Sequence, residues 1–266
     1  YGKRNSGIRL TAFVMSSVFF VYKINFRSFD SATAPAVRPL CVIQKTDTVK
    51  IENLEIHIDE FKSKAAATDR YTSFDYCYNY FRNTNDLTKD IEKSCLVLGF
   101  YLASWGMLRG SSFLLQKSAK HFQKLIEFYS TLDKDIWLID VDKYSIDTNS
   151  KIIEIYKKTK ENVIIENNTH LTLTTKILLG VFGFIPAYDQ YFCKTFNEIF
   201  KNKCGFTVVN NNSLNCLKEF YDNNQMTIDK LANKTFTTDF LTGEKTNITY
   251  PKAKIIDMFG FTNGLN

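Results

Sequence analysis

The chain has 266 residues, of which 44% are apolar and 15% aromatic, enough for one large packed domain or two small ones. Its formal charge is +6, but residues 1–65 hold 10 Lys and Arg against 6 Asp and Glu, whereas residues 66–266 hold 24 against 22. A body with nearly balanced charge is not typical of proteins that bind nucleic acid through a basic face.

Cysteine and histidine usage gives no sign of a metal site, a cofactor or a disulfide framework. The six cysteines form no CxxC pair, and the three histidines stand far apart in the sequence. We therefore predict no metal and no cofactor, and a reducing, cytoplasmic compartment. The residues concerned are Cys41, Cys77, Cys95, Cys193, Cys204 and Cys216, with His57, His121 and His170.

Residues 1–65 differ from the rest of the chain in charge and pattern. Lys3, Arg4 and Arg9 precede a 13-residue apolar run at 10–22, which is short for a membrane span and is followed by no small-residue cleavage site. We interpret this segment as a strand or a poorly ordered extension; since position 1 is not Met, it is also consistent with a fragment or a conceptual translation. Residues 51–62 have the pattern of a short strand or the start of a helix. The sequence predicts a boundary near residue 66, with residues 66–266 folding alone and no membrane span among them.

The most apolar stretch, residues 95–117, is predicted to be a buried central helix that the other helices cover. Its charged residues Arg109 and Lys117 argue against a membrane span. A kink or break is expected at residues 109–112, where Gly110 can end one helix and a serine can cap the next. Small residues on one face indicate a close helix crossing; they are Gly99, Ala103, Gly106 and Gly110.

Polar residues of this stretch make up the candidate binding site. Trp105, Arg109, Ser112 and Gln116 share one stripe if the helix continues, and Ser111 lies beside them. A buried arginine needs a carboxylate, carbonyl groups or an anionic ligand.

Two interpretations of Arg109 stay open. In the first it is clamped internally by Asp189 or Asp257; in the second its planar fork and the nearby serine hydroxyls bind an anion.

The remaining segments predict an all-α fold. Caps and apolar periodicity indicate helices on both sides of the central one, with Asp189 capping a helix through residue 200 and Pro251 opening the last helix. Short helices, short loops and no repeat predict an irregular multi-helix bundle around the central buried helix. The other predicted helices cover residues 73–83, 113–131, 151–161 and 173–182. A further helix follows a cap at Asn210–Ser213 and contains Leu214, Leu217, Phe220 and Tyr221.

Several segments resemble a family of uncharacterised bacterial all-helical proteins. The resemblance is carried by LGFYLASWGMLRGSSFLLQKS (98–118), SFDYCYNYF (73–81), TKILLGVFGFIPAYDQYF (175–192), and DFLTG (239–243) with YPKAKIIDMFGF (250–261). It covers roughly residues 66–266 and leaves residues 1–65 outside. The family has no activity to carry over, so the resemblance implies a helical fold and the boundary near residue 66.

The segment from Lys176 to Asp189 also resembles in part the helix-hairpin-helix DNA glycosylases. There, a lysine acts as a Schiff-base nucleophile and an aspartate positions or stabilises. This chain departs from that pattern because no glycine-rich hairpin precedes Lys176 and the spacing to Asp189 is short.

Two functions follow as hypotheses. The first is a soluble interaction or anion-binding module, whose partner is an anionic ligand or a protein, with Arg109, Ser111, Ser112, Trp105 and Gln116 as the site. The second is a DNA-acting enzyme of glycosylase-like type that uses Lys176 and Asp189 as catalytic residues.

Overall fold

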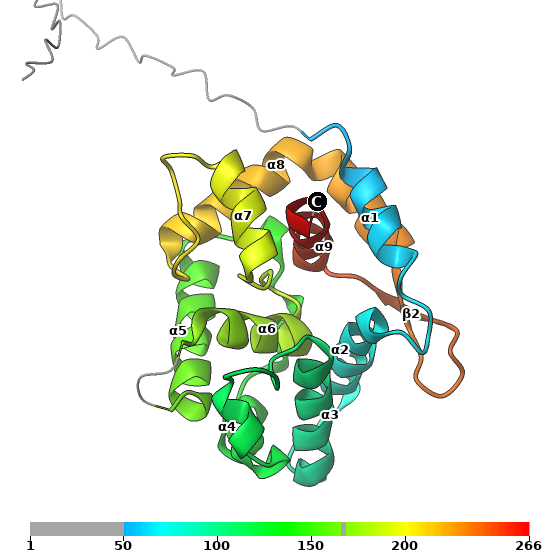
Figure 1. The fold of residues 1–266 in the computed structure, drawn as a ribbon, viewed down its shortest axis with the longest axis vertical. Helices are drawn as coiled ribbons and strands as arrows, with labels where there is room; N and C mark the ends of the chain where they lie inside the picture. Colours follow the sequence, from blue (N-terminus) through cyan, green and yellow to red (C-terminus); the bar gives the residue numbers. More distant parts are fainter. Residues whose placement is uncertain (1–50, 166–168, 266) are drawn as a thin grey trace, which may run out of the picture. The chain divides into compact units, whose positions relative to one another are not determined.

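The computed structural model describes residues 51–165 and 169–265, and the expectations for residues 1–50 lie outside this part. The described chain is mainly helical, as predicted, with nine α-helices, short 3₁₀ turns and one two-stranded sheet (Figure 1). The elements are α1 Leu54–Lys62, α2 Ser73–Asn83, α3 Ile91–Ser104, α4 Gln123–Ser130, α5 Ile146–Val163, α6 Leu171–Phe182, α7 Gln190–Ile199, α8 Asn211–Lys234, β1 Phe236–Thr238, β2 Lys245–Thr249 and α9 Lys252–Leu265.

The helices that the others cover are α6 and α9, not residues 95–117. In Figure 1, α6 lies across the middle, with α5 at one side and α2 and α3 at the other, and it packs against all three. Every residue from Leu173 to Phe182 is buried. Among the described residues, no helix is both long enough and apolar enough to cross a membrane.

The predicted central helix ends at Ser104, well before the break expected at Gly110. Gly106 takes a left-handed φ of +73°, and its N–H donates to Ala103 at 2.9 Å while the N–H of Met107 donates to Leu102 at 2.8 Å. These two bonds form a Schellman motif, which stops a helix where a glycine tolerates positive φ. The apolar residues that follow pack against the core from turns, so periodicity alone overstated the helix. Ser112 caps only a 3₁₀ turn, Phe113–Gln116, and the single helix predicted over residues 113–131 is divided into this turn, a second turn at Ala119–Phe122 and α4.

The packed body begins upstream of the boundary that we predicted at residue 66. Residues 54–62 form α1, which packs against α9 and buries Leu54, Ile58 and Phe61. Because these side chains complete the same core, residues 66–266 do not include all of it. The strand alternative for residues 51–62 is wrong.

Close helix crossings at glycines occur on α9 and on α6, and not at the glycines predicted within residues 95–117. A Cβ on Gly260 of α9 would lie 2.6 Å from Phe192 Cδ2 of α7. One on Gly180 of α6 would lie 2.3 Å from Tyr101 Cε1 of α3. In contrast, Gly99 has only an ordinary contact, 3.6 Å to Phe122.

A small hairpin interrupts the helical pattern and was missed in the sequence. β1 and β2 pair antiparallel, and Gly243 takes a φ of +70° in the connecting turn. The Asp239 side chain accepts from the N–H groups of Leu241 and Thr242, which fixes that turn.

Candidate functional site

A pocket of about 400 Å³ brings together three of the predicted binding residues. It lies between the loop that follows α3 and the amino end of α6. Its walls are formed by Gly106, Met107, Arg109, Ser111, Ser112 and Phe113 from the loop, and by Thr169, Leu171, Thr172 and Leu173 from the start of α6.

The first turn of α6 contributes Leu171, Thr172 and Leu173 to the lining of this pocket. The first N–H groups of a helix have no partner inside the helix, and together with the helix dipole they favour an anion. Within the described chain, the N-cap residue His170 makes no side-chain capping bond; its Nδ1 lies 3.1 Å from the Tyr156 hydroxyl. The amino end of α6 and Arg109 therefore both favour a negatively charged ligand.

The loop that carries Arg109 is held in shape by its own backbone. Gly106 and Gly110 both have positive φ, +73° and +60°. The Arg109 side chain folds back over Gly106, and its Nε lies 2.7 Å from the position that a Cβ on residue 106 would occupy. The Ser112 hydroxyl donates to the Met107 carbonyl at 2.6 Å and closes the loop.

The internal clamp predicted for Arg109 is wrong. Arg109 is exposed, and among the described residues no carboxylate forms an ion pair with it. The helix that would have buried Arg109 ends five residues earlier, so its side chain reaches the pocket rather than the core. The two proposed partners, Asp189 and Asp257, are each paired with a lysine instead.

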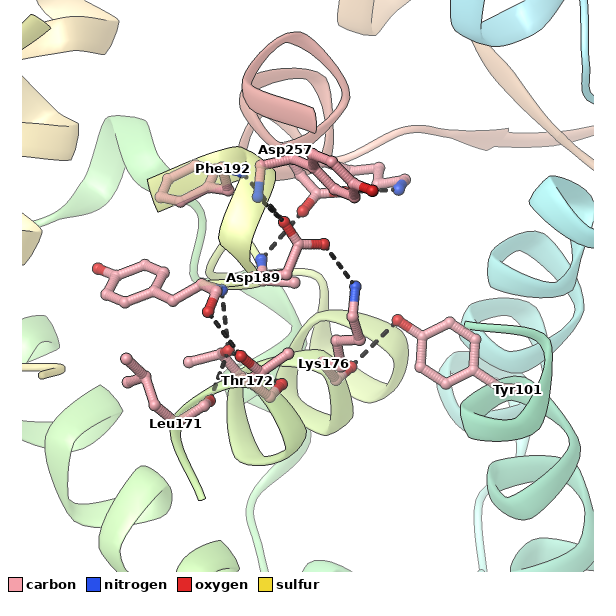
Figure 2. A network of polar contacts seen from close by, with 12 residues as sticks. Tyr101, Leu171, Thr172, Lys176, Asp189, Phe192 and Asp257 are labelled. Atoms are coloured by element: carbon pink, nitrogen blue, oxygen red, sulfur yellow. Dashed lines mark hydrogen bonds and ion pairs between the residues drawn. The ribbon is translucent and has the colours of Figure 1, made fainter. Parts of the chain in front are cut away.

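The two residues of the enzyme hypothesis, Lys176 and Asp189, do lie together (Figure 2). Lys176 Nζ is 2.9 Å from Asp189 Oδ2, with only 7% and 12% of the two side chains exposed. The other carboxylate oxygen accepts from the N–H groups of Tyr191 and Phe192, so Asp189 caps α7 as its position predicted. The backbone carbonyl of Lys176 accepts from the Tyr101 hydroxyl at 3.1 Å.

A second buried pair, Lys254 with Asp257, went unnoticed in the sequence. Their Nζ and Oδ2 atoms are 2.7 Å apart, and 1% and 9% of the side chains are exposed. Asp257 also accepts from the Ala187 N–H at 3.0 Å. The sequence does contain a signal for this pair, a lysine and an aspartate three residues apart within an apolar helix.

Trp105 joins the two ion pairs. Its ring centroid is 5.0 Å from Lys176 Nζ and 5.2 Å from Lys254 Nζ, distances typical of cation–π contacts. Its ring also stacks on Tyr71, at 5.4 Å between centroids. Trp105 therefore belongs to the aromatic core beside the pocket, not to the pocket wall. Gln116 is exposed at the end of its 3₁₀ turn and does not line the pocket.

The glycosylase-like use of Lys176 and Asp189 stays a hypothesis. An imine-forming lysine must present its Nζ to a substrate carbonyl, whereas Lys176 is buried and its Nζ is engaged by Asp189 and Trp105. Borohydride reduction in the presence of DNA with an abasic site would trap a covalent adduct if this chemistry operates, and Lys176→Met would abolish the adduct.

A second pocket, of about 260 Å³, is bordered by acidic and basic residues together. The Asp140 carboxylate accepts from the N–H groups of Lys252 and Ala253, at 2.7 and 2.9 Å, and so holds the start of α9. Burial raises the pKa of Asp140 to about 6, although backbone hydrogen bonds act in the opposite direction. In the described part of the chain, no group of three or more His, Cys, Asp or Glu residues is placed to hold a metal ion.

The raised pKa of Asp140 gives a pH-dependent contribution to stability. Because the folded state binds this proton more tightly than the unfolded state, the contribution is present at low pH and is lost as the pH rises through about 6. Between pH ~4.5 and ~7 the loss should be about 2 kcal/mol. Asp140→Asn, which keeps an acceptor oxygen, should remove this term. The free energy of unfolding in urea, measured for both proteins across this range, should therefore decline more steeply for the unchanged chain; parallel curves would contradict the assignment.

No protein-family model matches the chain, and comparison with curated proteins and with solved structures gives no match either.

Proposed function

We propose that this protein binds a small anionic ligand in the pocket between the α3–η2 loop and the amino end of α6, η2 being the turn Phe113–Gln116. The observation that carries the proposal is the joint position of Arg109 and Ser111 in one pocket that the first turn of α6 also borders, while the Ser112 hydroxyl donates to the Met107 carbonyl and holds the loop. A guanidinium fork, hydroxyl groups and helix amides are the groups that proteins use to hold carboxylates and phosphates.

The charges of the wall support an anion. Of the described residues that line the pocket, Arg109 alone is charged, and no carboxylate there competes for its guanidinium.

Arg109→Met should weaken anion binding by about ten-fold or more while changing the free energy of unfolding by less than about 0.5 kcal/mol. Calorimetric titration of the full chain with acetate, sulfate and inorganic phosphate at low ionic strength measures the first quantity, and urea unfolding measures the second. Lys117→Met removes an exposed charge at the end of η2 that does not line the pocket, and should leave the affinity nearly unchanged. Equal binding by the Arg109→Met protein, or no binding by the unchanged chain, would refute the proposed function.

A further inference from the structure

The pocket has an apolar half that a bare inorganic anion would leave unused. Met107 and Phe113 from the loop and Leu171 from α6 are each only partly buried in the core, and all three line the pocket. Leu173 closes the wall behind them. Ligand pockets of this kind combine apolar walls with a few polar groups that fix orientation.

The pocket offers one full positive charge. Arg109 supplies it, and the amino end of α6 adds about half a charge. A phosphate monoester carries about −1.5 to −2 at neutral pH, so a wall of about +1.5 matches its charge only at the lower of these values. A carboxylate carries a single charge and fits the planar arginine fork with two parallel hydrogen bonds.

Taking the proposed anion site as its basis, we infer that the ligand is an organic monocarboxylate with an apolar body. The carboxylate lies against Arg109 and the first turn of α6, and the apolar body lies on Met107, Phe113 and Leu171. A pocket of about 400 Å³ accommodates such a molecule at the small end of the range for ligand sites.

Three probes test the charged part and the apolar part of the pocket separately. Acetate carries only the charge, 3-phenylpropanol only the apolar body, and 3-phenylpropionate both. We expect 3-phenylpropionate to bind the full chain about ten-fold or more tightly than acetate, because burying a ring and one further methylene group favours the complex. Phe113→Ala, and separately Met107→Ala, should reduce this ratio without weakening acetate binding.

Two glycine variants test whether the position of the Arg109 side chain over Gly106 is needed for ligand binding. Gly106→Ala and Gly110→Ala impose the same left-handed strain, but only a Cβ at 106 meets the Arg109 side chain, since nothing lies within 4 Å of one at 110. Gly106→Ala should therefore weaken 3-phenylpropionate binding several-fold more than Gly110→Ala does.

The outcomes are distinguishable. If acetate and 3-phenylpropionate bind equally and Arg109→Met weakens both, the anion site stands and the inference about the ligand falls. Equal binding of 3-phenylpropanol and 3-phenylpropionate would overturn the requirement for charge. Phenyl phosphate binding much more tightly than 3-phenylpropionate would replace the carboxylate by a phosphate ester.

Discussion

Replacing Lys254 by Met should lower the free energy of unfolding by about 3–5 kcal/mol, because it leaves the Asp257 carboxylate buried without its counter-charge. Lys254 is the more buried partner, with 1% of its side chain exposed, and its Nζ lies 2.7 Å from Asp257 Oδ2. The ammonium also sits 4.8 Å from the ring centroids of both Phe61 and Phe74. Water therefore has little access to the Asp257 carboxylate once the substitution has removed the Lys254 ammonium.

A second substitution should recover part of that loss. Asp257→Asn removes the negative charge but keeps an oxygen that accepts from the Ala187 N–H, which the native carboxylate does at 3.0 Å. The double variant Lys254→Met/Asp257→Asn should thus be more stable than Lys254→Met alone, and urea unfolding of the four proteins gives the coupling energy. No recovery would mean that another cation, such as Lys62 or Lys176, matches Asp257.

The exposed pair Lys158–Glu161 provides the control. It has the same spacing of three residues and an Nζ–Oε2 distance of 3.0 Å, but 50% and 60% of its side chains are exposed. Lys158→Met should change the stability by less than about 1 kcal/mol, as surface ion pairs generally do. A comparable loss in both lysine variants would show that burial is not the cause.

The sequence predicted those parts of the fold whose signals are local. Asp189 caps α7 and Asn210 caps α8 because their short side chains reach the first-turn amides. Pro251 precedes α9 as expected, since its ring fits the first turn of a helix. Each of these interactions spans about three residues, so its partners are visible in sequence.

The extent of the helix after Cys95 could not be predicted in the same way. Trp105, Met107 and Phe113 continue the apolar character of this stretch, yet they reach the core from turns. The positive φ of Gly106 decides this, and glycine is compatible with a helix interior as well as with its end.

The pairing of the buried charges depends on the tertiary fold. Asp189 and Asp257 were expected to be buried and paired, but Arg109 was assigned as their cation. The chain between α6 and α7 turns at Gly183, with a φ of +72°, and brings Asp189 back to Lys176, 13 residues earlier. The sequence pattern does not show that the chain turns back here, so it could not identify which cation pairs with Asp189.

The second large effect is expected at the crossing of α3 and α6, which positions the pocket. A Cβ on Gly180 would lie 2.3 Å from Cε1 and 2.7 Å from Cζ of Tyr101, well inside van der Waals contact. Tyr101 has no room to move away, because it is 2% exposed and its hydroxyl is bonded to the Lys176 carbonyl. Gly180→Ala should therefore cost about 3 kcal/mol, even though alanine favours a helix by about 1 kcal/mol over glycine.

Gly99→Ala is the matched control, since Gly99 lies within α3 and its Cβ would meet only Phe122, at 3.6 Å. This change should be neutral or stabilising by up to about 1 kcal/mol. Thermal and urea unfolding of both variants measure the difference. A folded Gly180→Ala protein should also bind 3-phenylpropionate more weakly, because α6 must shift away from α3 and its first turn forms one wall of the pocket. Lost stability with unchanged affinity would mean that Tyr101 yields locally; unchanged stability would mean that the two helices do not touch at Gly180.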